Sequence, residues 1–195
     1  MEASKNIDGK VVEVKKDLFT LSNLVSVSRM LVPIPLALMG PPDGSPDLAF
    51  TLLVVWAILS DFLDGMLARW MNQVSELGKV LDPIADKVCA ALLFIFAVWI
   101  GRIPGWFLAV LIGRDILILL GSWVILSQHR KVAMSVMSGK ITVNILAVYW
   151  IVVMYFPNAA GWTLFLMGLS LLMMVYSTAE YVWRYLQIRK GASFN

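Results

Sequence analysis

Long apolar stretches recur along this 195-residue chain, and they limit its fold more than any other feature. Each is close to the roughly 20 residues that an α-helix needs to cross about 30 Å of hydrocarbon. The candidate spans lie at about residues 19–39, 48–70, 79–100, 106–126, 141–156 and 162–185. Because 59% of the residues are hydrophobic and only 15% are charged, a soluble helical core is disfavoured. The sequence therefore predicts an all-α, polytopic membrane protein with six transmembrane helices.

The segments outside the spans complete the predicted organisation. Residues 11–21 mix apolar and charged side chains, a pattern that favours an amphipathic helix on the membrane surface. The N-terminus lacks the short apolar core and small-residue cleavage site of a signal peptide. We predict a cytoplasmic or interfacial segment at 1–18, one six-helix membrane domain at 19–186 and a cytoplasmic tail at 187–195.

Lysine and arginine gather at alternate ends of the spans, which predicts the orientation of the chain. One side carries the N-terminal lysines and the basic residues of the second connection, the fourth connection and the C-terminal end, whereas the other side carries only Arg102. Both termini and the active site are therefore expected on the cytoplasmic side of a bacterial cytoplasmic membrane. The net charge is +3, and the basic residues lie beside apolar segments. This placement suits anionic lipid headgroups and gives no indication of nucleic-acid binding.

Four aspartates, Asp61, Asp64, Asp82 and Asp86, lie inside the second and third spans. A charged residue at membrane depth costs about 2.5–3.5 kcal/mol on insertion scales, so four of them indicate a functional site. At 100° per residue, Asp61 and Asp64 share one helical arc, and Asp82 and Asp86 share a stripe because they are four residues apart. The short connection between the two spans predicts an antiparallel pair with both acidic faces opposed near the cytoplasmic surface.

Carboxylates that converge in this way repel one another unless cations lie between them. Oxygen ligands suit hard divalent cations, which keep coordination positions open for phosphate oxygens. The sequence therefore predicts Mg²⁺ or Mn²⁺ as the cofactor.

The acidic residues also belong to a longer pattern, D-x2-D-G-x2-A-R-x8-G-x3-D-x3-D. Its fixed positions are Asp61, Asp64, Gly65, Ala68, Arg69, Gly78, Asp82 and Asp86. This pattern resembles the signature of the CDP-alcohol phosphotransferase family, also called the CDP-alcohol phosphatidyltransferase family. The resemblance extends more weakly through Asn23, Ser26 and Arg29 of the first span.

The resemblance implies transfer of a substituted phosphoryl group from a CDP-linked donor, here CDP-diacylglycerol, to a hydroxyl group, with release of CMP. It implies that Asp61, Asp64 and Asp82 bind metal, and that Asp86 either joins the second metal ion or acts as the general base. Gly65, Ala68 and Gly78 would allow the donor to approach the helices closely, and Arg69 would meet phosphate charge. A homodimer is also expected from the family.

The acceptor alcohol has to be inferred from cations outside the motif. Arg114 and Lys140 are candidates for binding an acceptor phosphate, although Arg114 beside Asp115 is also typical of a structural ion pair. Within the family, the pattern is most similar to the phosphatidylglycerophosphate synthases, which use glycerol 3-phosphate. Asp115 departs from the Glu common in that group, and Gly113-Arg114-Asp115 is also similar to cardiolipin synthases, which use phosphatidylglycerol. Phosphatidylinositol-phosphate and phosphatidylserine synthases rank below both.

A cation or proton transporter is the alternative from another functional class, because intramembrane carboxylates also relay ions. That function predicts ionisable residues spread across the membrane depth. The acidic residues here instead gather on one side, beside glycines and an arginine suited to phosphate, which favours the enzyme.

Overall fold

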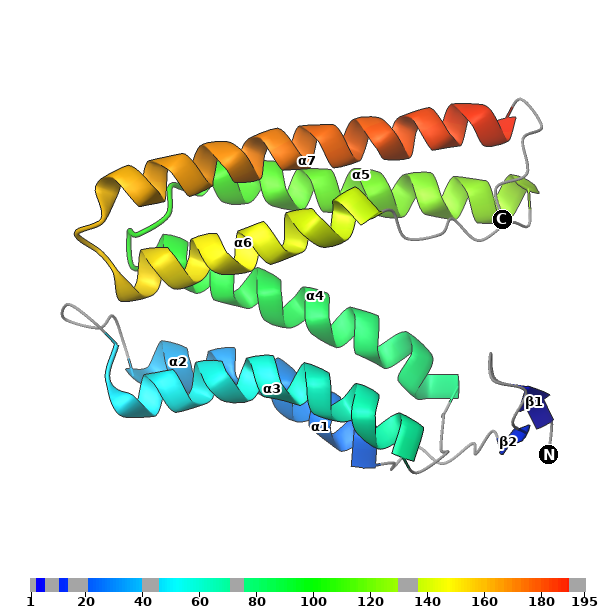
Figure 1. Ribbon diagram of the computed structural model, residues 1–195, viewed down its shortest axis with the longest axis horizontal. Helices are drawn as coiled ribbons and strands as arrows, with labels where there is room; N and C mark the ends of the chain where they lie inside the picture. The colour runs from blue at the N-terminus through cyan, green and yellow to red at the C-terminus, as the bar shows by residue number, and fades with distance from the viewer. Residues whose placement is uncertain are drawn as a thin grey trace. The chain divides into compact units, whose positions relative to one another are not determined.

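The computed structural model describes residues 3–5, 11–13, 21–39, 46–70, 76–129 and 137–189, most of them in α-helices (Figure 1). The helices are α1 (Leu21–Leu31), α2 (Pro33–Met39), α3 (Leu48–Trp70), α4 (Glu76–Trp99), α5 (Gly105–His129), α6 (Met137–Tyr155) and α7 (Ala160–Arg189). The chain divides into two compact units, Met1–Phe96 and Ala97–Asn195.

The predicted spans correspond to these helices to within a few residues, and α3 has the predicted bounds. The first span differs because it is broken into α1 and α2 at Val32, where a turn replaces the helix. Pro33 has no backbone N–H and disfavours helical geometry in the residue before it. The break is local, since the Leu36 amide still donates to the Val32 carbonyl at 3.4 Å.

The N-terminal segment differs from the predicted interfacial helix. Val11–Glu13 (β2) pairs antiparallel with Ala3–Lys5 (β1), so no helix begins at residue 11. The β-branched Val11 and Val12 favour this extended pairing over a helix. Residues 14–20 of the predicted helix lie outside the described part of the chain.

In the first unit, α1 packs against α3, and α2 contacts both of these helices. Asp47 caps α3, because its Oδ1 accepts a 2.8 Å hydrogen bond from the Phe50 amide. Phe50 also contacts Phe96 of α4, with ring centroids 6.0 Å apart. This contact joins the beginning of α3 to the end of the α4 segment in this unit.

In the second unit, α6 packs along α7, and α5 also contacts α7 (Figure 1). Thr142 links α6 to α7, because its hydroxyl donates a 3.2 Å hydrogen bond to the Met173 carbonyl of α7. Phe107 of α5 packs on Tyr149 of α6, with ring centroids 5.1 Å apart, and both side chains are fully buried. These contacts connect all three helices of the unit.

A glycine turn ends α4. Gly101 has φ 75°, and its amide bonds the Val98 carbonyl while the Arg102 amide bonds the Ala97 carbonyl. This is the Schellman pattern, in which a left-handed residue satisfies the last helical carbonyls. The turn presents Arg102 to the end of α6, where its Nη1 donates to the carbonyls of Val153 and Met154.

We expect Arg102→Ala to lower the free energy of unfolding by about 1–2 kcal/mol, because it removes a cation and its hydrogen bonds from a helix C-terminus. Thermal unfolding in detergent measures the change, and Arg102→Lys should retain part of the stability. An unchanged melting temperature for Arg102→Ala would contradict this capping role.

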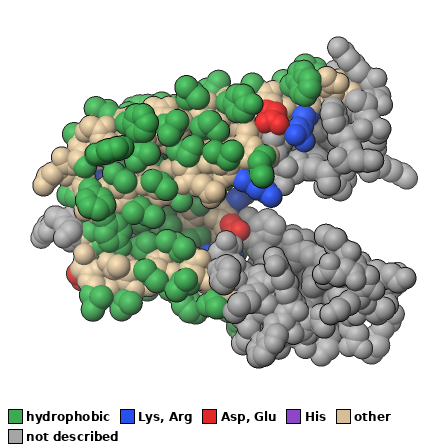
Figure 2. Space-filling view, in the orientation of Figure 1, with side chains coloured by type: hydrophobic (Ala, Val, Ile, Leu, Met, Phe, Trp, Pro, Cys, Tyr) green, Lys and Arg blue, Asp and Glu red, His purple; other side chains and the backbone are tan. Residues whose placement is uncertain are grey.

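Large hydrophobic side chains cover much of the described surface. On α7 alone, Trp162, Leu164, Phe165, Leu172 and Val175 are each more than half exposed. Figure 2 shows this apolar character over the described part of one face, with few charged side chains. Within the described residues, Met137–Tyr155 and Ala160–Gln187 are long and apolar enough to cross a membrane by length and composition. Leu24–Met39 and Leu48–Ser60 are shorter apolar helical segments.

Candidate functional site

The acidic motif lies on two helices of the first unit that run in opposite directions (Figure 1). The Phe50–Phe96 contact joins the beginning of α3 to the later part of α4. Asp64 follows Phe50 by 14 residues and Asp82 precedes Phe96 by 14, so each lies about 21 Å along its helix from this contact. Asp61 and Asp86 lie about 15–17 Å from it by the same measure. The motif residues of α3 and α4 therefore lie at similar distances along their helices from this contact.

Seven of the eight motif positions have side chains outside the described part: Asp61, Asp64, Gly65, Ala68, Arg69, Gly78 and Asp82. Their convergence on metal or donor stays a prediction. The chemistry of the set fits Mg²⁺ or Mn²⁺, because every acidic position on α3 and α4 supplies carboxylate oxygens. Asp86 is the motif aspartate whose side chain the structure describes. It is about half exposed, as a metal ligand or general base has to be in order to reach a substrate.

Asp86 forms an ion pair with α1. Its Oδ1 lies 2.7 Å from Nη2 of Arg29, whose side chain is only 4% exposed, whereas that of Asp86 is 49% exposed. Sequence reasoning gave Arg29 no role beyond a weak family resemblance. An arginine within an apolar span was the available signal, since such residues are rare without a partner. The identity of that partner depends on the packing of α1 against the acidic helices.

Arg114 lies in a polar cluster formed by α5 and α7 of the second unit. Its Nη1 is 2.7 Å from Asp115, which confirms the predicted ion pair, and its Nη2 donates to Ser177 of α7 at 3.0 Å. Its Nε has no hydrogen-bond partner among the described residues. The side chain is therefore held on two sides, and its buried Nε is an unused donor.

Gly139 allows α6 to approach this cluster. A Cβ at this position would lie 3.4 Å from the Tyr181 hydroxyl and 3.9 Å from Arg114 Nη2. The next residue, Lys140, is exposed at the same end of α6. The structure thus places both predicted acceptor cations near the beginning of α6, and it adds Ser177 and Tyr181, which the sequence did not indicate. Arg130 and Lys131 lie outside the described residues.

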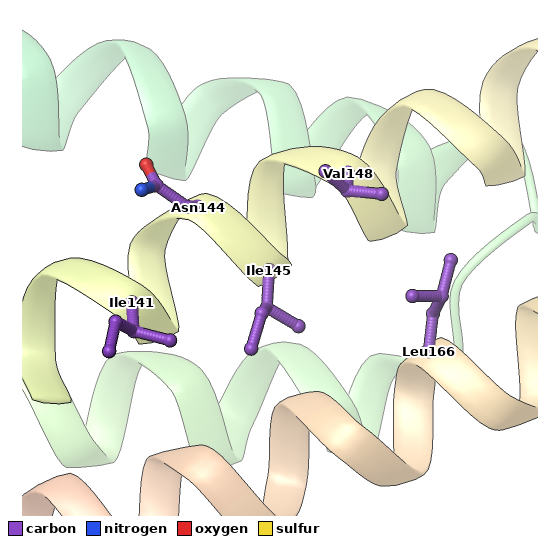
Figure 3. Close-up of a pocket in the computed structure, with 5 residues that line it drawn as sticks. All are labelled: Ile141, Asn144, Ile145, Val148 and Leu166. Atoms are coloured by element: carbon purple, nitrogen blue, oxygen red, sulfur yellow. The ribbon is translucent and has the colours of Figure 1, made fainter.

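A pocket of about 210 Å³ lies between α6 and α7 (Figure 3). Its lining residues are Ile141, Asn144, Ile145, Val148 and Leu166. None of these five is charged, and Asn144 contributes the polar side chain of the set. The pocket therefore lacks the cations that a nucleotide diphosphate or an acceptor phosphate requires.

Comparison with known proteins identifies the class. A family model described as CDP-alcohol phosphatidyltransferase matches residues 19–177, which include helices of both units. The chain therefore belongs to the CDP-alcohol phosphatidyltransferase family.

The relatives of this chain carry two different enzyme names. The chain is 31% identical over 137 residues to CDP-diacylglycerol--glycerol-3-phosphate 3-phosphatidyltransferase of Bacillus subtilis, covering 64% of this chain and 70% of that protein. The enzyme of the same name from Salmonella choleraesuis is 30% identical over 149 residues, covering 72% and 79%. Cardiolipin synthase (CMP-forming) of Streptomyces coelicolor is 37% identical over 106 residues, covering 52% of this chain and 49% of that protein. The chain thus spans about half the length of the Streptomyces relative.

Proposed function

We propose that this protein transfers the phosphatidyl group of CDP-diacylglycerol to an alcohol and releases CMP, with glycerol 3-phosphate as the acceptor. The observation that carries the proposal is the eight-position acidic motif on α3 and α4, within a family match over residues 19–177. The relatives named for glycerol 3-phosphate support the choice of acceptor, because their matches cover the larger share of both chains. The family match gives no support to the alternative of an ion transporter.

Each motif residue has its own proposed role in the reaction. Asp61, Asp64 and Asp82 would hold divalent metal, with Asp86 as a further ligand or as the base. Bound metal would neutralise the diphosphate and the departing CMP. Arg69 would add a cation beside the phosphates, and the small residues Gly65, Ala68 and Gly78 would leave room for the donor.

The reaction itself is a substitution at phosphorus. The acceptor oxygen forms a bond to the phosphorus that bears diacylglycerol, and the bond from that phosphorus to the bridging oxygen breaks. CMP leaves with the bridging oxygen, and the hydroxyl proton passes to Asp86 or to solvent. Arg114 and Lys140 would bind the phosphate of glycerol 3-phosphate during this step.

We further propose the cellular setting. Residues 19–186 would form one domain in a bacterial cytoplasmic membrane, with both termini and the active site on the cytoplasmic side. The exposed apolar side chains support the membrane setting. The distribution of basic residues supports the orientation. A homodimer is part of the same proposal.

Cardiolipin synthesis with phosphatidylglycerol as acceptor is the second candidate function. The similarity to the Streptomyces cardiolipin synthase and the presence of Asp115 favour it. The two functions differ in the acceptor and share the donor chemistry.

Radiolabelled CDP-diacylglycerol in detergent micelles, offered with one acceptor at a time, tests the proposal. We expect Mg²⁺- or Mn²⁺-dependent CMP release with glycerol 3-phosphate, lost on EDTA treatment and restored by added metal. Activity with phosphatidylglycerol alone would assign the protein to cardiolipin synthesis. Absence of CMP release with every polyol and polyol phosphate would overturn the enzymatic function.

A further inference from the structure

Arg29 and Asp86 form an asymmetric ion pair between α1 and α4. The arginine side chain is 4% exposed, whereas the aspartate side chain, 2.7 Å away, is 49% exposed. A guanidinium buried within an apolar helix needs a compensating anion, and Asp86 supplies one. Because Arg29 is buried and Asp86 is half exposed, a substrate can reach the Asp86 carboxylate but not the Arg29 guanidinium.

The helix that carries Arg29 is itself held against the other acidic helix. α1 packs along α3, which bears Asp61 and Asp64, while the Arg29 guanidinium reaches Asp86 on α4. Ser26, one turn before Arg29, is also fully buried, so this part of α1 lies inside the unit. Arg29 thus links α4 to α1, the helix that packs along the other acidic helix.

We propose that Arg29 is a positioning residue for Asp86. This inference rests on the proposed function. The guanidinium fixes the direction of the Asp86 carboxylate, so that its exposed part is held for the metal or the acceptor hydroxyl. A functional carboxylate needs such support, because a side chain on a helix surface otherwise samples several rotamers.

The proposal separates Arg29 from the cations that bind substrate. A phosphate-binding arginine has to present its donors to the ligand, and its loss raises the KM of that ligand. A positioning residue acts through its partner, so its loss lowers kcat and leaves substrate binding nearly intact. The two roles therefore give different kinetic signatures.

The test compares Arg29→Gln, Arg29→Lys and Asp86→Glu, with Arg29→Gln also made in the Asp86→Glu background. We expect Arg29→Gln to lower the kcat for CMP release by about 10- to 100-fold, the usual effect of losing a residue that orients a ligand. The KM values for CDP-diacylglycerol and for the acceptor should change little. Arg29→Lys should restore part of the kcat, and Arg29→Gln should cost much less once Asp86 has been replaced.

Arg184→Gln is the matched control, because Arg184 forms a helix-surface ion pair with Glu180 at 3.1 Å. It should keep the wild-type kcat. If Arg29→Gln does not fold, as judged by thermal unfolding and size-exclusion chromatography, Arg29→Lys decides the question by its effect on kcat. Unchanged kcat in a folded Arg29 variant, or a raised KM with kcat retained, would overturn the positioning role. Failure of the wild-type protein to release CMP would instead overturn the proposed function.

Discussion

Asp61→Asn and Asp82→Asn are each expected to abolish measurable CMP release while leaving the protein folded. A metal ion that polarises a phosphoryl oxygen stabilises the transition state by several kcal/mol, so loss of a metal ligand is expected to cost roughly two to four orders of magnitude in rate. Asn keeps the size of the side chain and removes its charge, so repulsion among the remaining carboxylates falls. The metal-free variants should therefore be at least as thermostable as the metal-free wild-type protein.

Asp47→Asn provides a control on the same helix. Asp47 caps the beginning of α3 through the Phe50 amide, and Asn is an equally good capping residue. This variant should retain wild-type activity and stability. Substantial activity in Asp61→Asn or Asp82→Asn, measured with saturating metal, would refute their assignment as metal ligands.

Arg114→Gln is expected to weaken the use of glycerol 3-phosphate much more than the use of CDP-diacylglycerol. Loss of a charge-assisted contact to phosphate costs about 2–5 kcal/mol, or roughly 30-fold or more in kcat/KM for the acceptor. The Arg114 guanidinium is held by Asp115 and Ser177, so its position does not depend on the ligand. Initial rates measured with each substrate varied in turn separate the two effects.

Arg114→Lys is the conservative variant for this prediction, and Arg184→Gln is its control. Lysine keeps the charge but cannot make the same two-sided contacts with Asp115 and Ser177, so an intermediate loss is expected. Arg184→Gln removes an arginine from another ion pair and should change neither kinetic constant. An equal effect of Arg114→Gln on donor and acceptor would show that Arg114 maintains the fold and has no selective role in acceptor binding.

The helices were largely predictable from the sequence, because helices that cross a bilayer of fixed thickness need apolar runs of similar length. α3 has the predicted bounds, and the other spans differ by a few residues. The break at Val32 also had a local signal in Pro33, but the prediction treated the first span as continuous. The N-terminal strands were missed because a short mixture of apolar and charged residues is compatible with either a helix or a hairpin.

The acidic motif likewise came from the sequence, because its members lie at helical spacing within two neighbouring spans. Their order along the chain, with one short connection, required α3 and α4 to run in opposite directions. The Phe50–Phe96 contact is consistent with that arrangement. Whether the motif side chains converge on metal is still a prediction.

The sequence by itself determined the apolar helices, the acidic positions on two of them and the family to which the chain belongs. Only the tertiary structure decided that Arg29 pairs with Asp86 and that Arg114 reaches Ser177, a residue 63 positions away. The physical reason is the range of the interactions. Hydrophobic periodicity and helical spacing are local properties of a chain, whereas the partner of a buried charge depends on which helices pack together and in what register.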